Sequence, residues 1–255
     1  MKKIIVSIIA LVAITMSVSA QKKYVVIYDK EGNDLHYYSS DDVSKVDFTD
    51  TYHEYVDLGL SVKWATCNVG ADSPEGYGDY YAWGETATKS EYEWTTYKLC
   101  NGSYSTLTKY CMISGYGTVD NKTTLEAADD VAYVKWGRSW RMPTETEFKE
   151  LIDNCTWTWC DGSTTQYNGT TVKGYKVTSN KSGYTDKSIF LPAAGERDGG
   201  TLNNDDLHCE YWSSSLSTTA SYNAMSLTFS DESNKYIMGG NSRCHGQSVR
   251  PVRAI

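Results

Sequence analysis

The segment from residue 195 to 211, GERDGGTLNNDDLHCEY, is crowded with side chains that could bind a ligand. Its carboxylates, amides and histidine are the donors that a calcium ion or a polar ligand would use. The alternative is a solvated loop that uses Asn, Asp and Gly to form turns. With two basic residues near the C-terminus added, the candidate ligand-binding residues are Arg197, Asn203, Asp205, Asp206, His208, Tyr211, Trp212, Arg243 and His245.

The seven cysteines could form disulfides or ligate a metal, and their odd number leaves at least one thiol free. Cys100 and Cys111 bracket a short polar loop and are the candidates for a local disulfide, although spacing alone does not fix connectivity. Cys155 and Cys160 are separated by Thr-Trp-Thr-Trp, and no second Cys or His pair follows at zinc-ligand spacing. We therefore expect structural or unpaired cysteines and no metal site.

Catalytic carboxylates are the next possibility, and Glu145, Glu147 and Glu150 fall on one predicted helix. Glu147 is explained as a helix cap, and acids on a helix surface are usually solvated. The sequence contains no nucleophile elbow, HExxH helix or phosphate-binding loop. We therefore predict no catalytic residue and no enzymatic activity.

Composition and the N-terminus indicate where the protein acts. The chain has 32 acidic and 24 basic residues and a net charge of −8, which disfavours nucleic acid and anionic membranes as partners. Residues 1–20 are typical of a signal peptide: Lys2 and Lys3, an apolar run over 4–16, and small residues before Gln21. That run is too short for a membrane span, and no later segment is comparably apolar. We expect a secreted, cell-surface or periplasmic protein with no transmembrane segment after the signal peptide.

Residues 21–50 are predicted to form an N-terminal hairpin segment and linker. Two apolar and aromatic runs, 24–29 and 35–39, flank a turn at 30–34. An isolated hairpin is only marginally stable, so we expect this segment to dock on something.

Residues 51–255 are predicted to form one α+β domain with short strands and two main helices. One helix is placed within 123–136, where Leu125, Ala128 and Ala132 share a stripe. The other follows Pro143, with Thr144 and Glu147 as a capping box and Phe148, Leu151 and Ile152 as the buried face. Strands are predicted at 55–60, 61–69, 78–84, 174–179, 188–195, 210–215, 224–230, 235–240 and 248–253.

Eight tryptophans and twenty-one tyrosines raise the possibility of sugar binding, because aromatic faces stack on sugar rings. Aromatic residues also bury the largest area in protein cores. We assign to the core Trp64, Trp83, Trp136, Trp140, Trp157 and Trp159.

Seven phrases in a fixed order resemble a known family. They are YVDLGLSVKWATCNVGA (55–71), GDYYAWGE (78–85), WGRSWRMPTETEFKEL (136–151), NCTWTW (154–159), IFLPAAGERDG (189–199), YWSSS (211–215) and SVRPV (248–252). Together they are similar to the Fibrobacter succinogenes major paralogous domain, which is abundant in secreted proteins of Bacteroidetes.

The resemblance implies a C-type-lectin-like fold, similar to that of formylglycine-generating enzymes. A proline-capped helix would then pack beside a small sheet, and the strand at 248–253 would neighbour the strand at 55–60. The calcium motifs of sugar-binding lectins, Glu-Pro-Asn or Gln-Pro-Asp with Trp-Asn-Asp, do not occur in this chain, so no cofactor is expected. The paired C-terminal cysteines of the copper oxidases are also missing, and a disulfide between Cys209 and Cys244 explains these two residues more simply.

These observations predict a secreted or surface-exposed, non-enzymatic binding or adhesion module. It would recognise a glycan or a surface protein through loops around 197–212 and 231–245. The alternative is a structural or assembly subunit whose hairpin adds a strand to a partner's sheet, which co-purification without residues 23–48 would test. A copper oxidase of the formylglycine-generating type is the remote alternative.

Overall fold

The computed structural model describes residues 24–28, 34–39, 53–203, 206–230 and 236–255. The chain divides into two units, residues 1–52 and residues 53–255. The described helices and strands are β1 (Tyr24–Tyr28), β2 (Asp34–Ser39), β3 (Tyr55–Val56), β4 (Lys63–Ala65), η1 (Trp94–Thr96), η2 (Ser114–Tyr116), α1 (Val131–Trp136), α2 (Glu145–Asn154), β5 (Cys155–Cys160), β6 (Gly174–Ser179), β7 (Ser188–Pro192), β8 (Glu196–Asp198), β9 (Thr201–Asn203), β10 (His208–Leu216), β11 (Asn223–Ser230), β12 (Tyr236–Ser242) and β13 (Val252–Arg253).

The first unit contains the predicted hairpin, in which β1 and β2 pair in antiparallel register from Tyr24 with Ser39 to Tyr28 with Asp34. Most of its predicted turn and the predicted signal peptide, residues 1–20, lie outside the described residues. None of the described helices is long and apolar enough to cross a membrane.

The second unit is an α+β domain, as predicted, and its best-predicted element is helix α2. The Thr144 hydroxyl accepts a hydrogen bond from the Glu147 backbone N–H at 3.2 Å, and a Glu147 carboxylate oxygen accepts one from the Thr144 N–H at 2.7 Å. Phe148 and Leu151 are fully buried, and the Phe148 ring centroid lies 5.3 Å from that of Trp64. The sequence pattern therefore places both the start of the helix and its buried face correctly.

Helix α1 is much shorter than the predicted helix within 123–136, because it begins only at Val131. The Asp130 carboxylate caps it by accepting hydrogen bonds from the N–H groups of Ala132 and Tyr133. Upstream, Leu125 donates its backbone N–H to the carbonyl of Ser214 instead of to a helical turn. The predicted helical stripe is therefore wrong over its first half.

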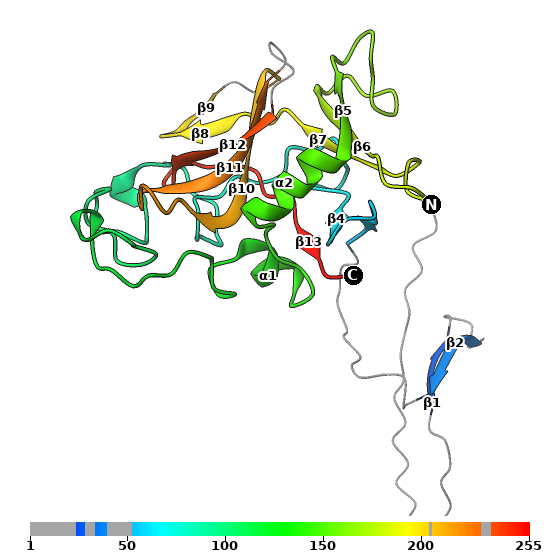
Figure 1. Ribbon diagram of the computed structural model, residues 1–255, viewed down its shortest axis with the longest axis horizontal. Helices are drawn as coiled ribbons and strands as arrows, with labels where there is room; N and C mark the ends of the chain where they lie inside the picture. The colour runs from blue at the N-terminus through cyan, green and yellow to red at the C-terminus, as the bar shows by residue number, and fades with distance from the viewer. Residues whose placement is uncertain (1–23, 29–33, 40–52, 204–205, 231–235) are drawn as a thin grey trace, which may run out of the picture. The chain divides into compact units, whose positions relative to one another are not determined.

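The start and the end of the domain meet in one small antiparallel sheet. Its strand order is β13-β4-β3, and Val252 and Val56 both pair with Trp64 on the central strand. The strands predicted as neighbours, 55–60 and 248–253, share this sheet, but β4 lies between them. Figure 1 shows β13 beside β4 near the C-terminus.

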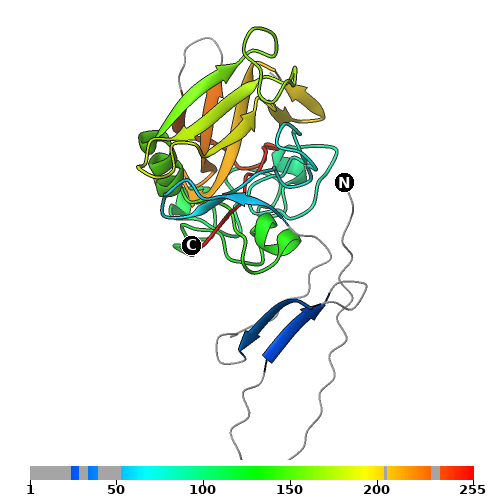
Figure 2. The ribbon, with the colours of Figure 1, turned by 90° about the vertical axis from the view of Figure 1, so that its right-hand side faces the viewer.

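Two larger antiparallel sheets, β5-β6-β7 and β10-β11-β12, supply most of the remaining regular structure. Helix α2 leads directly into β5, and Figure 2 shows the two sheets in the upper part of the domain. The stretch predicted as an irregular loop after residue 195 contains a further hairpin, in which β8 pairs with β9. Its turn places Gly199 at a φ of 56°, which a glycine adopts without strain.

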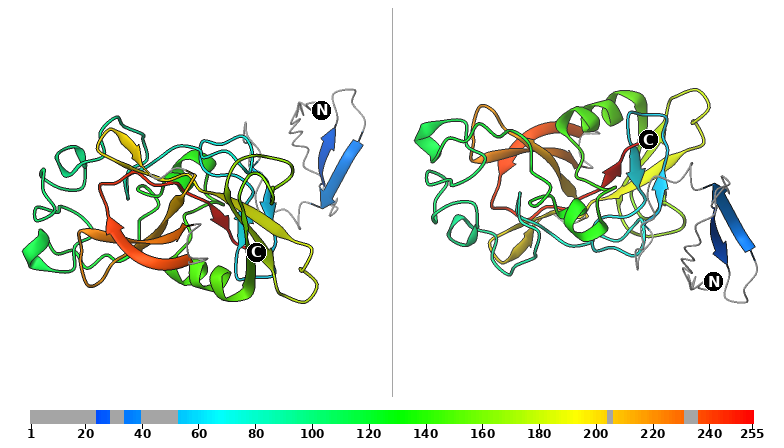
Figure 3. Two further views of the ribbon diagram at one scale, coloured as in Figure 1. Left: turned by 90° about the horizontal axis from the view of Figure 1, so that it is seen from above. Right: turned by 90° about the horizontal axis from the view of Figure 1, so that it is seen from below.

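The predicted core tryptophans are all at least partly buried. Trp64, Trp83 and Trp140 are at most 4% exposed, whereas Trp136, Trp157 and Trp159 are partly buried at the edge of the core. Long connections between β4 and α1 gather at the end of the domain away from the β5-β6-β7 sheet (Figures 1 and 3). These connections build the candidate site.

Candidate functional site

A surface pocket of about 340 Å³ opens where three segments of the domain meet. The residues that line it are Tyr92, Glu93, Trp94, Thr95, Asp198, Cys244 and His245. The backbones of Tyr92 and Gly199 exchange hydrogen bonds, and those of Arg197 and Gly246 do the same. A Cβ on Gly246 would lie 2.7 Å from the Tyr92 ring, so glycine permits this close approach. The pocket walls are thus joined by backbone pairing.

Acidic groups surround the histidine of this pocket. The His245 Nδ1 atom lies 3.2 Å from a carboxylate oxygen of Glu196, and its Nε2 atom lies 3.5 Å from one of Asp198. The hydrogen bond to Glu196 raises the pKa of His245 against the opposing effect of burial, and the charge of Asp198 adds to it. His245 therefore carries a larger share of positive charge near neutral pH than a free histidine does.

A partly buried carboxylate, Glu210 on β10, is close enough to Glu196 and His245 for their charges to act on it. It accepts hydrogen bonds from the side-chain amides of Asn241 and Gln247, the latter at 2.5 Å. Burial, together with the charge of Glu196, raises the pKa of Glu210 to about 7. The site therefore contains a carboxyl group that exchanges its proton near neutral pH.

Because the pKa of Glu210 is raised, the free energy of unfolding of the protein should fall as the pH rises. Between about pH 4.5 and 7 the folded protein holds a proton that the unfolded chain has released, so this stability is present below pH 4.5 and lost as the pH rises through 7. The raised pKa of His245 acts in the same direction above pH 6.5. We expect the free energy of unfolding to fall by on the order of 2 kcal/mol from pH 5 to pH 8.

Urea unfolding of the wild type and two variants at four pH values between 5 and 8 measures this effect. Glu210→Gln should remove most of the dependence, whereas Glu91→Gln, which removes an exposed carboxylate, should leave it unchanged. Equal pH dependence in the wild type and Glu210→Gln would contradict the assignment.

Beside the pocket, four aromatic side chains form a continuous patch that we call the aromatic surface: Trp94, Tyr104, Tyr116 and Tyr222. The Tyr104 ring centroid lies 6.4 Å from that of Trp94 and 5.6 Å from that of Tyr222. Tyr104 is 50% exposed, and the other three are partly exposed. Because Trp94 also lines the pocket, the aromatic surface and the pocket are contiguous.

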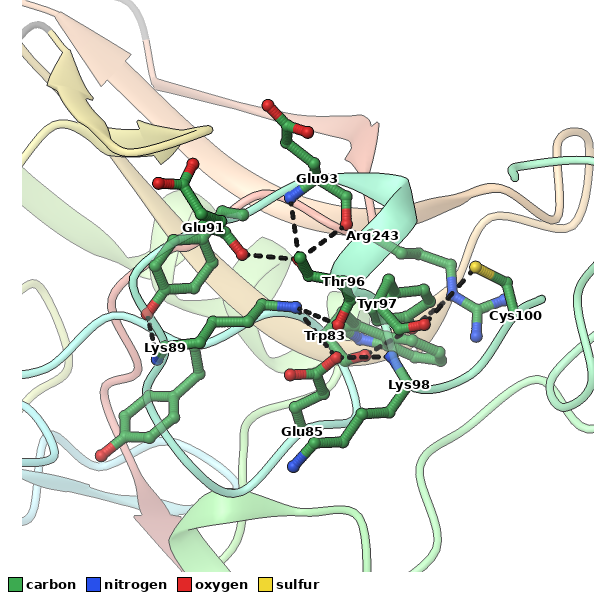
Figure 4. Close-up of polar contacts among 12 residues, drawn as sticks. Trp83, Glu85, Lys89, Glu91, Glu93, Thr96, Tyr97, Lys98, Cys100 and Arg243 are labelled. Carbon is green, nitrogen blue, oxygen red and sulfur yellow. Dashed lines mark hydrogen bonds and ion pairs between the residues drawn. The ribbon is translucent and has the colours of Figure 1, made fainter. Parts of the chain in front are cut away.

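A buried arginine, Arg243, holds the loops that carry the aromatic surface. Its guanidinium donates hydrogen bonds of 3.0 Å to the Tyr97 hydroxyl and to the carbonyls of Lys109, Tyr110 and Ser221. The same group lies 4.9 Å from the Trp83 ring centroid (Figure 4). Arg243 is therefore a structural residue, and its predicted role as a ligand contact is wrong because it is fully buried.

The loop that leads to Trp94 is fixed by a second buried charge, Glu85. The Lys89 ammonium lies 3.0 Å from the Glu85 carboxylate, which also accepts a hydrogen bond from the Lys98 backbone at 2.8 Å (Figure 4). The Glu85 side chain is 1% exposed, so the ion pair is shielded from water on that side. Glu85 therefore links Lys89 to Lys98 across the loop that carries Trp94.

The structure separates the predicted ligand-binding residues into different environments. Tyr211 and Trp212 are fully buried, and the Trp212 indole donates to the Tyr81 carbonyl at 2.8 Å, so neither can touch a ligand at the surface. Among the others, His245 lines the pocket. Four are at least partly exposed, namely Arg197 over the Tyr80 ring, Asn203 on β9, Asp206 bound to the Tyr77 hydroxyl, and His208 at the start of β10. Asp205 lies outside the described residues.

All seven cysteines are thiols, so neither predicted disulfide is formed. The Cys100 sulfur contacts the Trp94 carbonyl at 3.2 Å and the Cys111 sulfur contacts the Ile113 carbonyl at 3.2 Å. Burial raises the pKa of Cys209 and of Cys244 to about 12. In the part of the chain that the structure describes, no group of three or more His, Cys, Asp or Glu side chains could hold a metal ion.

The sequence reasoning missed the side of the site formed by residues 91–116. A signal was present, because EYEWTTYKLCNGSY places four aromatic residues among charged and small polar ones with no apolar period. Two of these four residues, Trp94 and Tyr104, lie on the aromatic surface, whereas Tyr92 and Tyr97 are buried in the core. No family model, curated protein or solved structure matches the chain.

Proposed function

We propose that this protein is an exported, non-enzymatic binding module that recognises a glycan through the aromatic surface and the adjoining pocket. The observation that carries the proposal is their continuity through Trp94, which lines the pocket and whose ring lies beside that of Tyr104. A sugar ring has apolar faces that stack on aromatic rings and hydroxyl edges that need hydrogen-bond partners. The aromatic surface offers the first kind of contact and the pocket the second.

The charges of the pocket support a neutral or cationic ligand. Glu93 and Asp198 are exposed carboxylates that can accept hydrogen bonds from sugar hydroxyl groups. His245 is already held between Glu196 and Asp198, so it can donate to a ligand only by exchanging one of these partners. An acidic sugar would meet repulsion from the carboxylates.

We also propose that residues 53–255 adopt a C-type-lectin-like fold and belong to the family that the sequence phrases resemble. Two features support this: the capped helix α2 contacts β10 and β11, and β13 joins the sheet of β3 and β4. The copper oxidase alternative is not favoured, because its chemistry needs two closely spaced cysteines near the C-terminus and this chain has Cys244 alone there. The assembly-subunit alternative rests on the β1-β2 hairpin, whose two described strands pair only with each other.

Substitution of the aromatic surface tests the glycan proposal. A glycan array identifies a ligand of the wild type, and calorimetry then compares Trp94→Ala and Tyr104→Ala with it. We expect each variant to bind about tenfold more weakly, because one stacking contact contributes about 1–1.5 kcal/mol. Asp198→Asn should weaken binding less.

The matched control is Tyr184→Ala, which removes a half-buried tyrosine outside the aromatic surface. It should bind as the wild type does. The proposal fails if the wild type binds no glycan, or if Trp94→Ala and Tyr184→Ala bind equally well.

A further inference from the structure

A second pocket, of about 430 Å³, lies near the C-terminus of the domain and has the opposite charge. Its walls include the end of α1, residues 138–141 and β13 with the residues after it. Three of its lining residues are arginines, Arg138, Arg141 and Arg253, and no lining side chain is acidic. We call it the arginine pocket. In a chain of net charge −8, three guanidinium groups around one cavity form a local exception to the overall charge.

Arg253 is held in place without using its hydrogen-bond donors. Its guanidinium lies 4.9 Å from the Tyr55 ring centroid and 5.6 Å from that of Trp140. Stacking on two aromatic faces fixes the plane of the group while leaving its N–H edges available. The Lys63 ammonium lies 5.0 Å from the same Tyr55 ring, which adds further positive charge nearby.

The three arginines are not equally neutralised. The two terminal nitrogens of Arg141 donate to the two carboxylate oxygens of Glu147, at 2.7 and 2.5 Å. Glu147 is also part of the capping box of α2. Among the described residues, the guanidinium groups of Arg138 and Arg253 have neither a hydrogen bond nor an ion pair. Two donor groups without an acidic partner therefore face one cavity.

We propose that the arginine pocket binds a small ligand through an oxyanion group, such as a carboxylate or a sulfate. Arg138 and Arg253 donate to the anionic oxygens, since the planar guanidinium matches the geometry of an oxyanion. The partly buried ring of Tyr133 forms a wall for the rest of the ligand. This site is independent of the aromatic surface and selects the opposite charge.

Glucuronate and glucose provide a matched pair of probes, since they differ by one carboxylate, and sodium sulfate tests whether an oxyanion alone suffices. Calorimetry or ligand-observed NMR on the full mature chain at low salt measures binding. We expect glucuronate to bind with a dissociation constant in the millimolar range and glucose not to bind. Arg138→Gln and Arg253→Gln should each weaken glucuronate binding by about tenfold, which corresponds to the loss of one charge-assisted interaction.

Lys149→Gln is the matched control, because it removes one positive charge from an exposed side chain on α2 that does not line the pocket. It should change binding by less than twofold. Arg138 is exposed and makes neither a hydrogen bond nor an ion pair with the described residues, so its variant stays informative even if Arg253→Gln unfolds. Sulfate binding that is weakened by the same two variants would show that the oxyanion is sufficient.

The proposal is overturned if neither glucuronate nor sulfate binds to the wild type. It is also overturned if Lys149→Gln weakens binding as much as Arg138→Gln does, because a general charge effect would then account for the result. Glucuronate binding that Trp94→Ala abolishes and Arg138→Gln preserves would assign the ligand to the aromatic surface instead.

Discussion

Replacing Arg243 by leucine is expected to lower the free energy of unfolding by at least about 3 kcal/mol, because two buried carbonyls and one partly buried carbonyl lose their donor. Each unsatisfied buried acceptor costs about 1–3 kcal/mol, while the leucine recovers part of the loss by burying apolar surface. The cation–π contacts with Trp83 and Tyr97 are lost as well. Urea unfolding followed by tryptophan fluorescence measures the change.

A conservative substitution separates the charge of this residue from its shape. Arg243→Lys keeps the charge, but one ammonium cannot reach acceptors on four sides, so it should recover less than half of the loss. Arg138→Leu, at an exposed position, should change stability by less than about 0.5 kcal/mol. A fully stable Arg243→Leu protein would show that Arg243 does not hold these loops and would return it to the list of possible ligand contacts.

The second large effect is expected at Trp212, where alanine should cost about 3–5 kcal/mol of folding free energy. Trp212 is fully buried on β10, and its removal leaves a cavity in the core formed with Val131, Met142 and Val249. Trp212→Phe should cost less, because the ring is kept. The lost indole hydrogen bond leaves the Tyr81 carbonyl with its other donor, the Gln247 backbone N–H at 3.0 Å.

Comparison with Trp94 makes this prediction specific. Trp94→Ala should weaken glycan binding while changing stability by much less than Trp212→Ala, because Trp94 is only partly buried. Thermal unfolding of both variants, with binding measured on the same samples, tests the contrast. Normal stability of Trp212→Ala together with lost binding would contradict the core assignment.

The predictable parts of the fold are those in which local chemistry determines the structure. Thr144 and Glu147 make a reciprocal cap within one turn, so four residues suffice to place the start of α2. The helix predicted within 123–136 begins only at Val131, where Asp130 caps it. Upstream of Asp130, the Leu125 backbone N–H bonds to the Ser214 carbonyl and not to a carbonyl of a helical turn. The two residues are far apart in the sequence, so a local pattern does not reveal this contact.

The candidate site was predicted only in part for a related reason. His245 and Asp198 line the pocket, but Tyr211 is fully buried, and the other wall of the pocket comes from residues 92–95. Arg243 and His245 are two positions apart on the chain, yet one is fully buried and the other lines a pocket. Residue type alone cannot separate them, because the outcome depends on the tyrosine and carbonyl groups that distant loops bring to Arg243.

The pairing of β3 and β13 with the same central strand has a consequence for how this domain can be combined with others. Because both strands flank β4, the polypeptide enters and leaves the domain about two strand spacings apart, roughly 10 Å. A folding unit whose ends lie this close can be inserted into a surface loop of a host protein without distorting either partner. The same geometry permits circular permutation, in which a short linker joins residue 255 to residue 53 and new ends are opened in an exposed loop.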